Sequence, residues 1–267
     1  MTTNLTFGSL FAGIGGMDLG LERAGMTCKW QVEIDDYATR VLEKHWPDVR
    51  RFRDVRTVGN HNLESVDLIC GGFPCQDISN VGKRAGIEGE RSGLWSEYFR
   101  LISELRPRYV LVENVSALLV RGLGRVLGDL ASCGYDAEWQ CIPAASVGAP
   151  HIRDRVWVLA YPGRQLGDVQ AEHNDGRDIM LSQGFDGQAS EWGDDRELVA
   201  LVPGVHSGTS ENWWRTQSRM DRSVNGIAFG MDRLRTLGNT VVPQVAEWIG
   251  RRITQTTRAG SGDNDRT

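Results

Sequence analysis

The chain has 267 residues, enough to bury a full hydrophobic core as one α/β domain with a smaller appendage. Its formal net charge of −5 excludes the overall basic surface of many nucleic-acid-binding proteins, so any phosphate contacts must come from local clusters of cations. No apolar run of about 18 residues occurs, and the five cysteines contain no CxxC pair. These features predict a cytoplasmic protein with no membrane association and no metal site.

Residues 1–160 alternate short apolar strands with helical patterns, which is typical of a parallel sheet with crossover helices. Strands are predicted at residues 5–11, 28–34, 66–70, 109–113, 137–142 and 155–161, and helices at 17–24, 37–45, 94–105, 124–133 and 245–254. Residues 162–231 are rich in Gly, Asp, Ser, Gln and Asn, which predicts a small irregular domain or loop system. Residues 258–267 are predicted to form a disordered tail. Residues 1–161 and 232–257 then form the main domain.

A glycine-rich turn follows the first predicted strand, with the sequence Phe11-Ala12-Gly13-Ile14-Gly15-Gly16. Glycines after a strand allow a sharp turn and a close approach to a ligand, although the GxGG spacing does not match the dinucleotide fingerprint GxGxxG. Glu33 lies about 20 residues further on, where a carboxylate can accept hydrogen bonds from ribose hydroxyls. Asp54 ends the next segment and is a candidate partner for an adenine amino group. The alternative is a simple strand–turn–helix junction.

A second candidate site is the sequence Gly71-Gly72-Phe73-Pro74-Cys75-Gln76, which follows a short β-branched run. The double glycine ends the strand, and Pro74 fixes the backbone just before the thiol. Cys75 is therefore predicted at the carboxyl end of a strand, where open α/β sheets place their ligands and chemistry. For a lone cysteine, the alternative is a buried structural residue beside a proline turn.

Three charged residues are predicted at the same edge of the sheet as Cys75. Glu113 directly follows an apolar strand, and burial there would raise its pKa and allow it to donate a proton to a ring nitrogen. Arg153 and Arg155 stand at positions i and i+2 at the start of a strand and so point the same way. The alternatives are a carboxylate that caps the next helix and two arginines that face solvent. Asn239 precedes the last helix, where a helix cap is the common role.

Taken in this order and spacing, the Gly-rich turn, Glu33, Pro74-Cys75-Gln76, Glu113-Asn114-Val115, Arg153-x-Arg155 and Gly238-Asn239 resemble the cytosine carbon-5 DNA methyltransferase family. The resemblance covers residues 5–161 and 232–250, and the size is similar to that of compact bacterial and bacteriophage modification enzymes. It implies a Rossmann-like fold that binds S-adenosylmethionine, double-stranded DNA as the substrate and a monomeric enzyme. It also implies restriction–modification as the biological setting.

The resemblance assigns roles to individual positions. Cys75 would attack carbon 6 of a flipped-out cytosine, Glu113 would protonate or hydrogen-bond ring nitrogen 3, and Arg155, with Arg153 beside it, would hold the cytosine oxygen. The residues implied around the cofactor are Phe11, Gly13, Ile14, Gly16, Glu33, Ile34, Asp54, Val55, Gly72, Pro74, Leu94 and Asn239. Residues 77–93 would form a loop that closes over the DNA, and residues 162–231 would recognise the target sequence.

DNA contacts are predicted in the loop and in the recognition region. The candidates are Gln76, Ser79, Lys83, Arg84, Arg91, Trp213, Trp214, Arg215 and Arg219. For the paired tryptophans, the alternative is that they form the core of a small domain. The basic run at residues 50–56 is a candidate patch for phosphate contacts, and its alternative is a solvated face. His151 and Ile78 depart from the family pattern, and the recognition region is short and acidic.

Two other functions remain as alternatives to DNA methylation. A related subfamily resembles this catalytic set and methylates transfer RNA with the same chemistry. An inactive binding module that keeps the cofactor fold is the third possibility, against which the intact Cys75, Glu113 and Arg155 argue.

Overall fold

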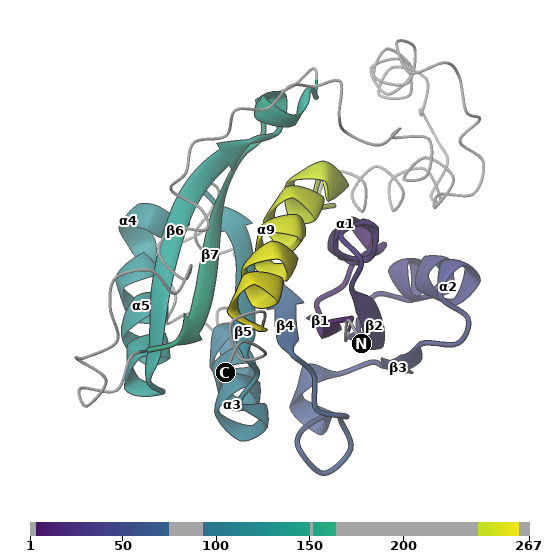
Figure 1. The fold of residues 1–267 in the computed structure, drawn as a ribbon. Helices are drawn as coiled ribbons and strands as arrows, with labels where there is room; N and C mark the ends of the chain where they lie inside the picture. The colour runs from purple at the N-terminus through teal and green to yellow at the C-terminus, as the bar shows by residue number, and fades with distance from the viewer. Residues whose placement is uncertain (1–3, 75–92, 150–151, 164–239, 262–267) are drawn as a thin grey trace.

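A computed structural model describes residues 4–74, 93–149, 152–163 and 240–261 of the chain. These residues form a seven-stranded sheet with helices on both faces (Figure 1), as the predicted Rossmann-like α/β class requires. The strands are β1 (Thr6–Leu10), β2 (Thr27–Val32), β3 (Arg50–Phe52), β4 (Leu68–Gly71), β5 (Tyr109–Val115), β6 (Tyr135–Pro143) and β7 (Asp154–Pro162). The helices are α1 (Gly16–Arg23), α2 (Asp36–His45), α3 (Gly93–Leu105), α4 (Leu118–Arg121), α5 (Leu123–Ser132) and α9 (Pro243–Ser261), with single 3₁₀ turns η1 (Val55–Thr57) and η3 (Ala144–Val147).

The strand order is β3-β2-β1-β4-β5-β7-β6. From β1 the chain proceeds outward through β2 to β3, and it then returns to β4 on the other side of β1. The crevice between the carboxyl ends of β1 and β4 is therefore the topological switch point, where open α/β sheets bind their ligands.

The prediction of a parallel sheet with crossover helices is wrong for the last two strands. β7 pairs antiparallel with β5, and β6 pairs antiparallel with β7. The direction of β7 has a consequence for the site, because it brings the start of this strand to the carboxyl end of β5. Arg155 lies opposite Val115 in this register.

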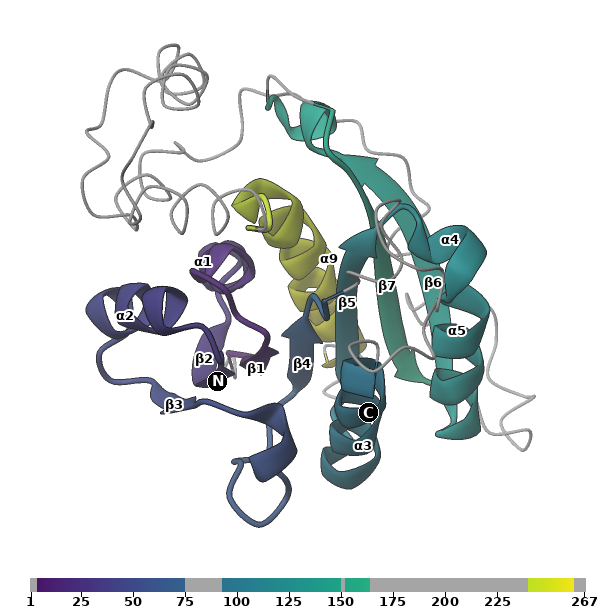
Figure 2. The same ribbon diagram turned by 180° about the vertical axis from the view of Figure 1, so that it is seen from behind.

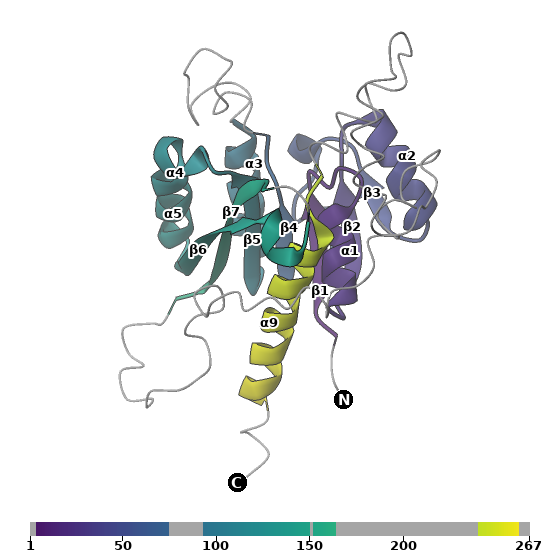
Figure 3. The ribbon, with the colours of Figure 1, turned by 90° about the horizontal axis from the view of Figure 1, so that it is seen from above.

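Alternate residues of each strand face the two helical layers. Val110 and Val112 belong to the core beneath α3 and α5, whereas Tyr109 and Leu111 belong to the core beneath α1 and α9. Figures 2 and 3 show the two layers on opposite faces of the sheet. A smaller cluster around Ile14 packs against α2.

The ends of several elements differ from the sequence predictions. β3 and α4 were not predicted, and α9 continues to Ser261, so the prediction of a disordered tail is wrong for residues 258–261. The predicted recognition region lies outside the described residues, apart from 162 and 163. Among the helices that the structure describes, none combines the length and apolar character needed to span a membrane.

Candidate active site

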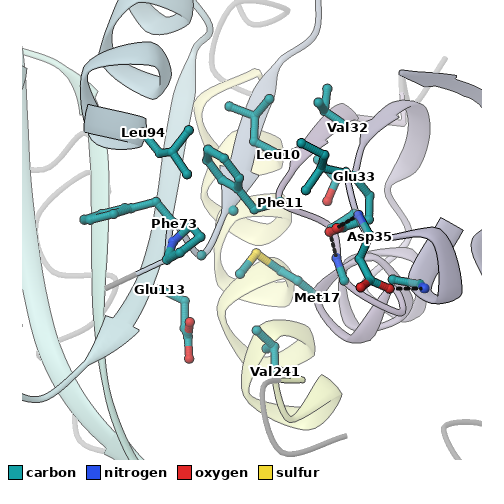
Figure 4. A pocket seen from close by; sticks show the side chains of 18 of the residues that line it. Leu10, Phe11, Met17, Val32, Glu33, Asp35, Phe73, Leu94, Glu113 and Val241 are labelled. Carbon is teal, nitrogen blue, oxygen red and sulfur yellow. Dashed lines mark hydrogen bonds between the residues drawn. The ribbon is translucent and has the colours of Figure 1, made fainter. Parts of the chain in front are cut away.

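A cavity of about 790 Å³ opens at the switch point. Four strands end at it, because Phe11 follows β1, Glu33 follows β2, Gly72 follows β4 and Glu113 lies near the end of β5. Figure 4 shows Glu33 and Glu113 on different sides of this cavity, with Phe11 and Met17 between them. We call these sides the Glu33 end and the Glu113 end.

Most predicted cofactor residues meet at this cavity. The lining includes Phe11, Gly13, Gly16, Glu33, Ile34, Asp54, Val55, Gly72, Pro74 and Leu94. Ile14 does not line it, because its side chain is fully buried among the residues of α2. Asn239 lies outside the described residues, although its neighbour Thr240 belongs to the lining.

The Glu33 end is built from backbone hydrogen bonds. One carboxylate oxygen of Glu33 accepts from the Gly13 N–H at 2.7 Å, and the other accepts from the Asp35 N–H at 2.8 Å. Asp35 in turn caps α2 by accepting from the Ala38 N–H. One carboxylate thus ties the Gly-rich turn to the start of α2. Burial raises its pKa, and the two N–H donors oppose that shift.

The Gly-rich turn contains positive φ angles and a close backbone contact that few residue types can accept. Gly13 has a φ of 57°, and a Cβ atom added there would meet nothing within 4 Å. Phe11 adopts a φ of 54°, which is uncommon for a residue with a side chain; such backbone conformations cluster at active and ligand-binding sites. Gly16 is required for another reason, since its Cβ would lie 2.4 Å from the Val241 carbonyl oxygen.

Asp54 also lines the cavity and follows β3, the strand next to β2. Its side chain accepts from the Arg56 N–H at 3.0 Å and so caps the 3₁₀ turn η1. The basic run around it is engaged within the protein: Arg51 donates to the end of α2, and Arg53 binds Asp36 and the Ile34 carbonyl. These contacts favour a structural role for that run over the predicted phosphate patch.

The Glu113 end carries an ion pair. The Arg155 Nε lies 3.0 Å from Glu113 Oε1, and the Arg153 Nη2 donates to the Thr240 carbonyl at 2.9 Å. Burial raises the pKa of Glu113, as predicted, while Arg155 and Arg153 oppose the shift. The pKa of Arg153 falls to about 10, because it is buried and lies beside Arg155, with Glu113 opposing. Because all three residues line the cavity, the sequence prediction that they share one edge of the sheet is confirmed.

The double glycine before Cys75 has a structural explanation that the sequence did not reveal. A Cβ on Gly71 would lie 2.3 Å from the Leu10 carbonyl oxygen, and a Cβ on Gly72 would lie 2.7 Å from Glu113 Oε2. Both distances are too short for any real contact, so Gly72 leaves room for the Glu113 carboxylate.

Cys75 lies outside the described residues, but the residues before it are placed. Pro74 lines the cavity, and the Asn114 side chain donates to the Phe73 carbonyl at 3.1 Å. Phe73 also packs against Trp95 of α3, with ring centroids 5.4 Å apart. The predicted DNA contacts Gln76, Ser79, Lys83, Arg84, Arg91, Trp213, Trp214, Arg215 and Arg219 also lie outside the described residues.

Several residues of the cavity were missed from the sequence. They include Met17, Asp35, Arg53, Arg56, Phe73, Asn114, Val115, Thr240 and Val241. Asp35 carried a readable signal, because an Asp before an amphipathic run is a typical helix cap. Thr240 and Val241 reach the site only through the packing of α9 beside α1, which local sequence patterns do not encode.

Comparison with known proteins identifies the family. Residues 5–178 match the model of the C-5 cytosine-specific DNA methylases. The chain belongs to this family. It is 29% identical to the Type II methyltransferase M2.BsuMI of Bacillus subtilis (strain 168), over 92% of this chain and 75% of that relative.

Two further matches agree with this family. The Type II methyltransferase M.Eco47II of Escherichia coli is 37% identical over 57% of this chain, but that alignment spans only 38% of the relative. The fold is also that of the Entamoeba histolytica methyltransferase EhMeth, with a TM-score of 0.64 at 15% identity, covering 96% of this chain and 99% of that chain. The protein is a DNA (cytosine-5-)-methyltransferase, and its family uses S-adenosylmethionine as the methyl donor.

Proposed function

We propose that the cavity binds S-adenosylmethionine at its Glu33 end and a flipped-out cytosine of duplex DNA at its Glu113 end. The observation that carries this proposal is the pair of differently built carboxylates in one cavity. Glu33 is held by backbone N–H groups beside the Gly-rich turn, whereas Glu113 is held by a guanidinium beside Pro74.

The residues at the Glu33 end fit the proposed cofactor. Glu33 keeps lone pairs for ribose hydroxyls, and Asp54 offers an acceptor to an adenine amino group. The apolar residues Ile34 and Val55 also line the cavity. A volume of about 790 Å³ is within the range of ligand sites and leaves room for a second, smaller group. When bound, S-adenosylmethionine supplies an electrophilic methyl group.

The residues at the Glu113 end fit the activation of a cytosine. In the proposed reaction, the Cys75 thiolate adds to carbon 6 of the ring, and this addition makes carbon 5 nucleophilic. A buried carboxyl with a raised pKa suits Glu113 to hydrogen-bond or protonate ring nitrogen 3 as negative charge develops there. Arg155 would hold both Glu113 and the cytosine oxygen. After methyl transfer a base removes the carbon 5 proton and the thiol leaves.

The test is covalent trapping. The methylated sequence is first read by bisulfite sequencing of DNA from cells that express the protein. A duplex with 5-fluorocytosine at that position should then form a stable adduct on Cys75 in the presence of S-adenosylmethionine, because fluorine cannot leave as the proton does. Mass spectrometry locates the adduct. Cys75→Ser should form none, whereas the control Cys133→Ser, at a cysteine away from the cavity, should form as much as wild type.

Either of two results would overturn the proposal. One is an adduct on Cys70, which is fully buried within strand β4, and the other is no adduct at a confirmed target site. Tritiated-methyl transfer to transfer RNA but not to DNA would assign the same chemistry to the other polymer. Transfer to neither, with the cofactor still bound, would indicate an inactive binding module.

Sequence recognition remains a proposal for residues 162–231, including Trp213, Trp214, Arg215 and Arg219. Exchange of this segment with that of a relative of known specificity should transfer the methylated sequence. Persistence of the parental sequence would place recognition elsewhere in the chain.

A further inference from the structure

The cavity residues Asp54 and Val55 lie on a part of the sheet with little supporting secondary structure. Asp54 and Val55 begin the single 3₁₀ turn η1, which follows β3 at the sheet edge. β3 has only three residues, and residues 58–67 after η1 form no helix or strand before β4 begins at Leu68. A short turn also leaves carbonyl groups without partners of its own.

Arg100 of α3 supplies the missing donors. Its Nη2 atom lies 3.1 Å from the Val55 carbonyl and 2.9 Å from the Val58 carbonyl. A charged donor forms stronger hydrogen bonds than a neutral one, and a guanidinium can serve several acceptors at once. One side chain therefore fixes both ends of the segment that follows Asp54.

Two glutamates on the same helix face orient Arg100. Glu97 binds its Nε and Glu104 binds its Nη1, both at 2.8 Å, from positions i−3 and i+4. Glu104 also accepts from the Asn60 N–H at 3.1 Å, so the cluster contacts the segment at a third point. The hydrogen bond from Arg100 holds the pKa of Glu104 below its ordinary value.

The Arg100 cluster is less exposed than an ordinary surface ion pair. The side chains of Arg100, Glu97 and Glu104 are 33%, 27% and 29% exposed. The Arg125–Asp129 pair on α5 has the same i,i+4 spacing and the same 2.8 Å distance, but Arg125 is 55% exposed. None of these five residues lines the cavity itself, but Arg100 binds the carbonyl of Val55, which does. This second pair is a matched internal control.

We propose that Arg100, held by Glu97 and Glu104, is a positioning residue that sets the affinity and the adenine selectivity of the cofactor site through Asp54 and Val55. Leu94 at the start of the same helix lines the cavity, so α3 contributes to the site directly as well as through this cluster. The inference rests on the proposed placement of S-adenosylmethionine at the Glu33 end.

The test measures binding by calorimetry with two probes, S-adenosylhomocysteine and its hypoxanthine analogue S-inosylhomocysteine. Asp54 can accept from the amino group of adenine, and hypoxanthine has no such group. We expect Arg100→Ala to weaken S-adenosylhomocysteine binding about tenfold, and to reduce the preference for adenine, because Asp54 is no longer fixed. Arg125→Ala should change neither quantity.

Kinetics and a conservative variant separate positioning from folding. At saturating S-adenosylmethionine, Arg100→Ala should keep kcat within about twofold, so that the loss appears in the KM for the cofactor. Arg100→Lys should recover part of the affinity but not all, because an ammonium lacks the fork that serves two carbonyls and two carboxylates. If Arg100→Ala does not fold, the lysine variant and Glu104→Gln carry the test.

The outcomes also distinguish the two proposals. If wild-type protein does not bind S-adenosylhomocysteine, the placement of the cofactor fails. If wild type binds it but Arg100→Ala and Arg100→Lys keep the same affinity and adenine preference, the positioning role of Arg100 is refuted while the cofactor site stands. If Arg100→Ala loses the same factor of affinity for both probes, Arg100 has a purely structural role and does not set adenine selectivity.

Discussion

The two ends of the cavity use equally buried carboxylates in different ways. Glu33 and Glu113 are each 8% exposed, and burial raises the pKa of both. Glu33 accepts from the backbone N–H groups of Gly13 and Asp35, which the fold holds in place. Glu113 is paired with Arg155, a side chain that can exchange one partner for another.

The difference indicates that the two ends of the cavity have different functions. A carboxylate fixed by backbone donors presents its remaining lone pairs in one geometry, which suits the recognition of an unchanging group such as a ribose. A carboxyl with a raised pKa beside two guanidinium groups suits a site that must stabilise charge as it develops on the substrate. The Glu113 end is therefore expected to carry the chemistry and the Glu33 end to carry the binding.

Glu113→Gln tests the chemical end and should have the largest effect. The amide keeps the shape but cannot supply a proton, so kcat should fall by about 10²- to 10⁴-fold while cofactor affinity stays within about twofold. Methyl transfer under single-turnover conditions measures the first quantity, and calorimetry measures the second. Glu43→Gln, on the exposed face of α2, is the control. A loss of cofactor affinity equal to the loss of kcat would contradict the division of roles.

Gly72→Ala should damage the same end through geometry alone. The new Cβ would lie 2.7 Å from Glu113 Oε2, so the carboxylate or the strand must move. A displacement of about 1 Å at a reacting group can cost about 10²-fold in turnover, and we expect a loss of that order. Gly128→Ala on α5 is the matched control, because a Cβ there meets nothing within 4 Å. Full activity in Gly72→Ala would show that Glu113 tolerates displacement.

Glu33→Gln tests the binding end. Its amide retains one acceptor oxygen but places an NH₂ group opposite either the Gly13 or the Asp35 N–H, so the turn loses a partner. Affinity for S-adenosylhomocysteine should fall about tenfold, with kcat at saturating cofactor reduced far less than in Glu113→Gln. Glu64→Gln, at an exposed carboxylate, is the control. The comparison fails if the effect falls on kcat instead of on cofactor affinity.

Local patterns predicted most elements of the fold but not the direction of its last strands. Short apolar runs locate both ends of β1, β2, β4, β5, β6 and β7 to within two residues, because burial imposes the same composition on each. β7 is buried on both faces, as the parallel strands β4 and β5 are, so its apolar run does not reveal its direction. β3 was read as a basic run because two of its three residues are arginines.

The site was predicted where its parts follow strands, and missed where it depends on contacts between distant segments. Glu113 and Arg155 were predicted from their places at strand ends. The space that Gly72 leaves for Glu113 joins residues 41 positions apart, and no local pattern contains it. Arg100 was not singled out from the sequence, because the sequence does not show that the Val55 carbonyl of η1 and the Val58 carbonyl just after it face this side chain.

A third buried carboxylate, Asp18, supplies the smallest and last prediction. It is fully buried in α1 and accepts hydrogen bonds from Ser9 and Gln31, both of which are uncharged side chains. Burial raises its pKa above the ordinary value of 3.8, and the hydrogen bonds only partly oppose that shift. Between 3.8 and the raised pKa the folded state holds a proton that the unfolded state has released, so the contribution of Asp18 to stability is present below that window and declines as pH rises through it.

Asp18→Asn removes this titration. The free energy of unfolding of wild type, relative to the variant, should fall by on the order of 1 kcal/mol as the pH is raised from about 4 to 8. Urea denaturation at several pH values measures it, and Asp48→Asn at the protein surface should show no such trend. If wild type instead gains stability over Asp18→Asn with rising pH, the carboxylate is stabilised in its charged form. Burial would then not be the dominant influence on the carboxylates of this fold, and the same argument for Glu113 would lose its basis.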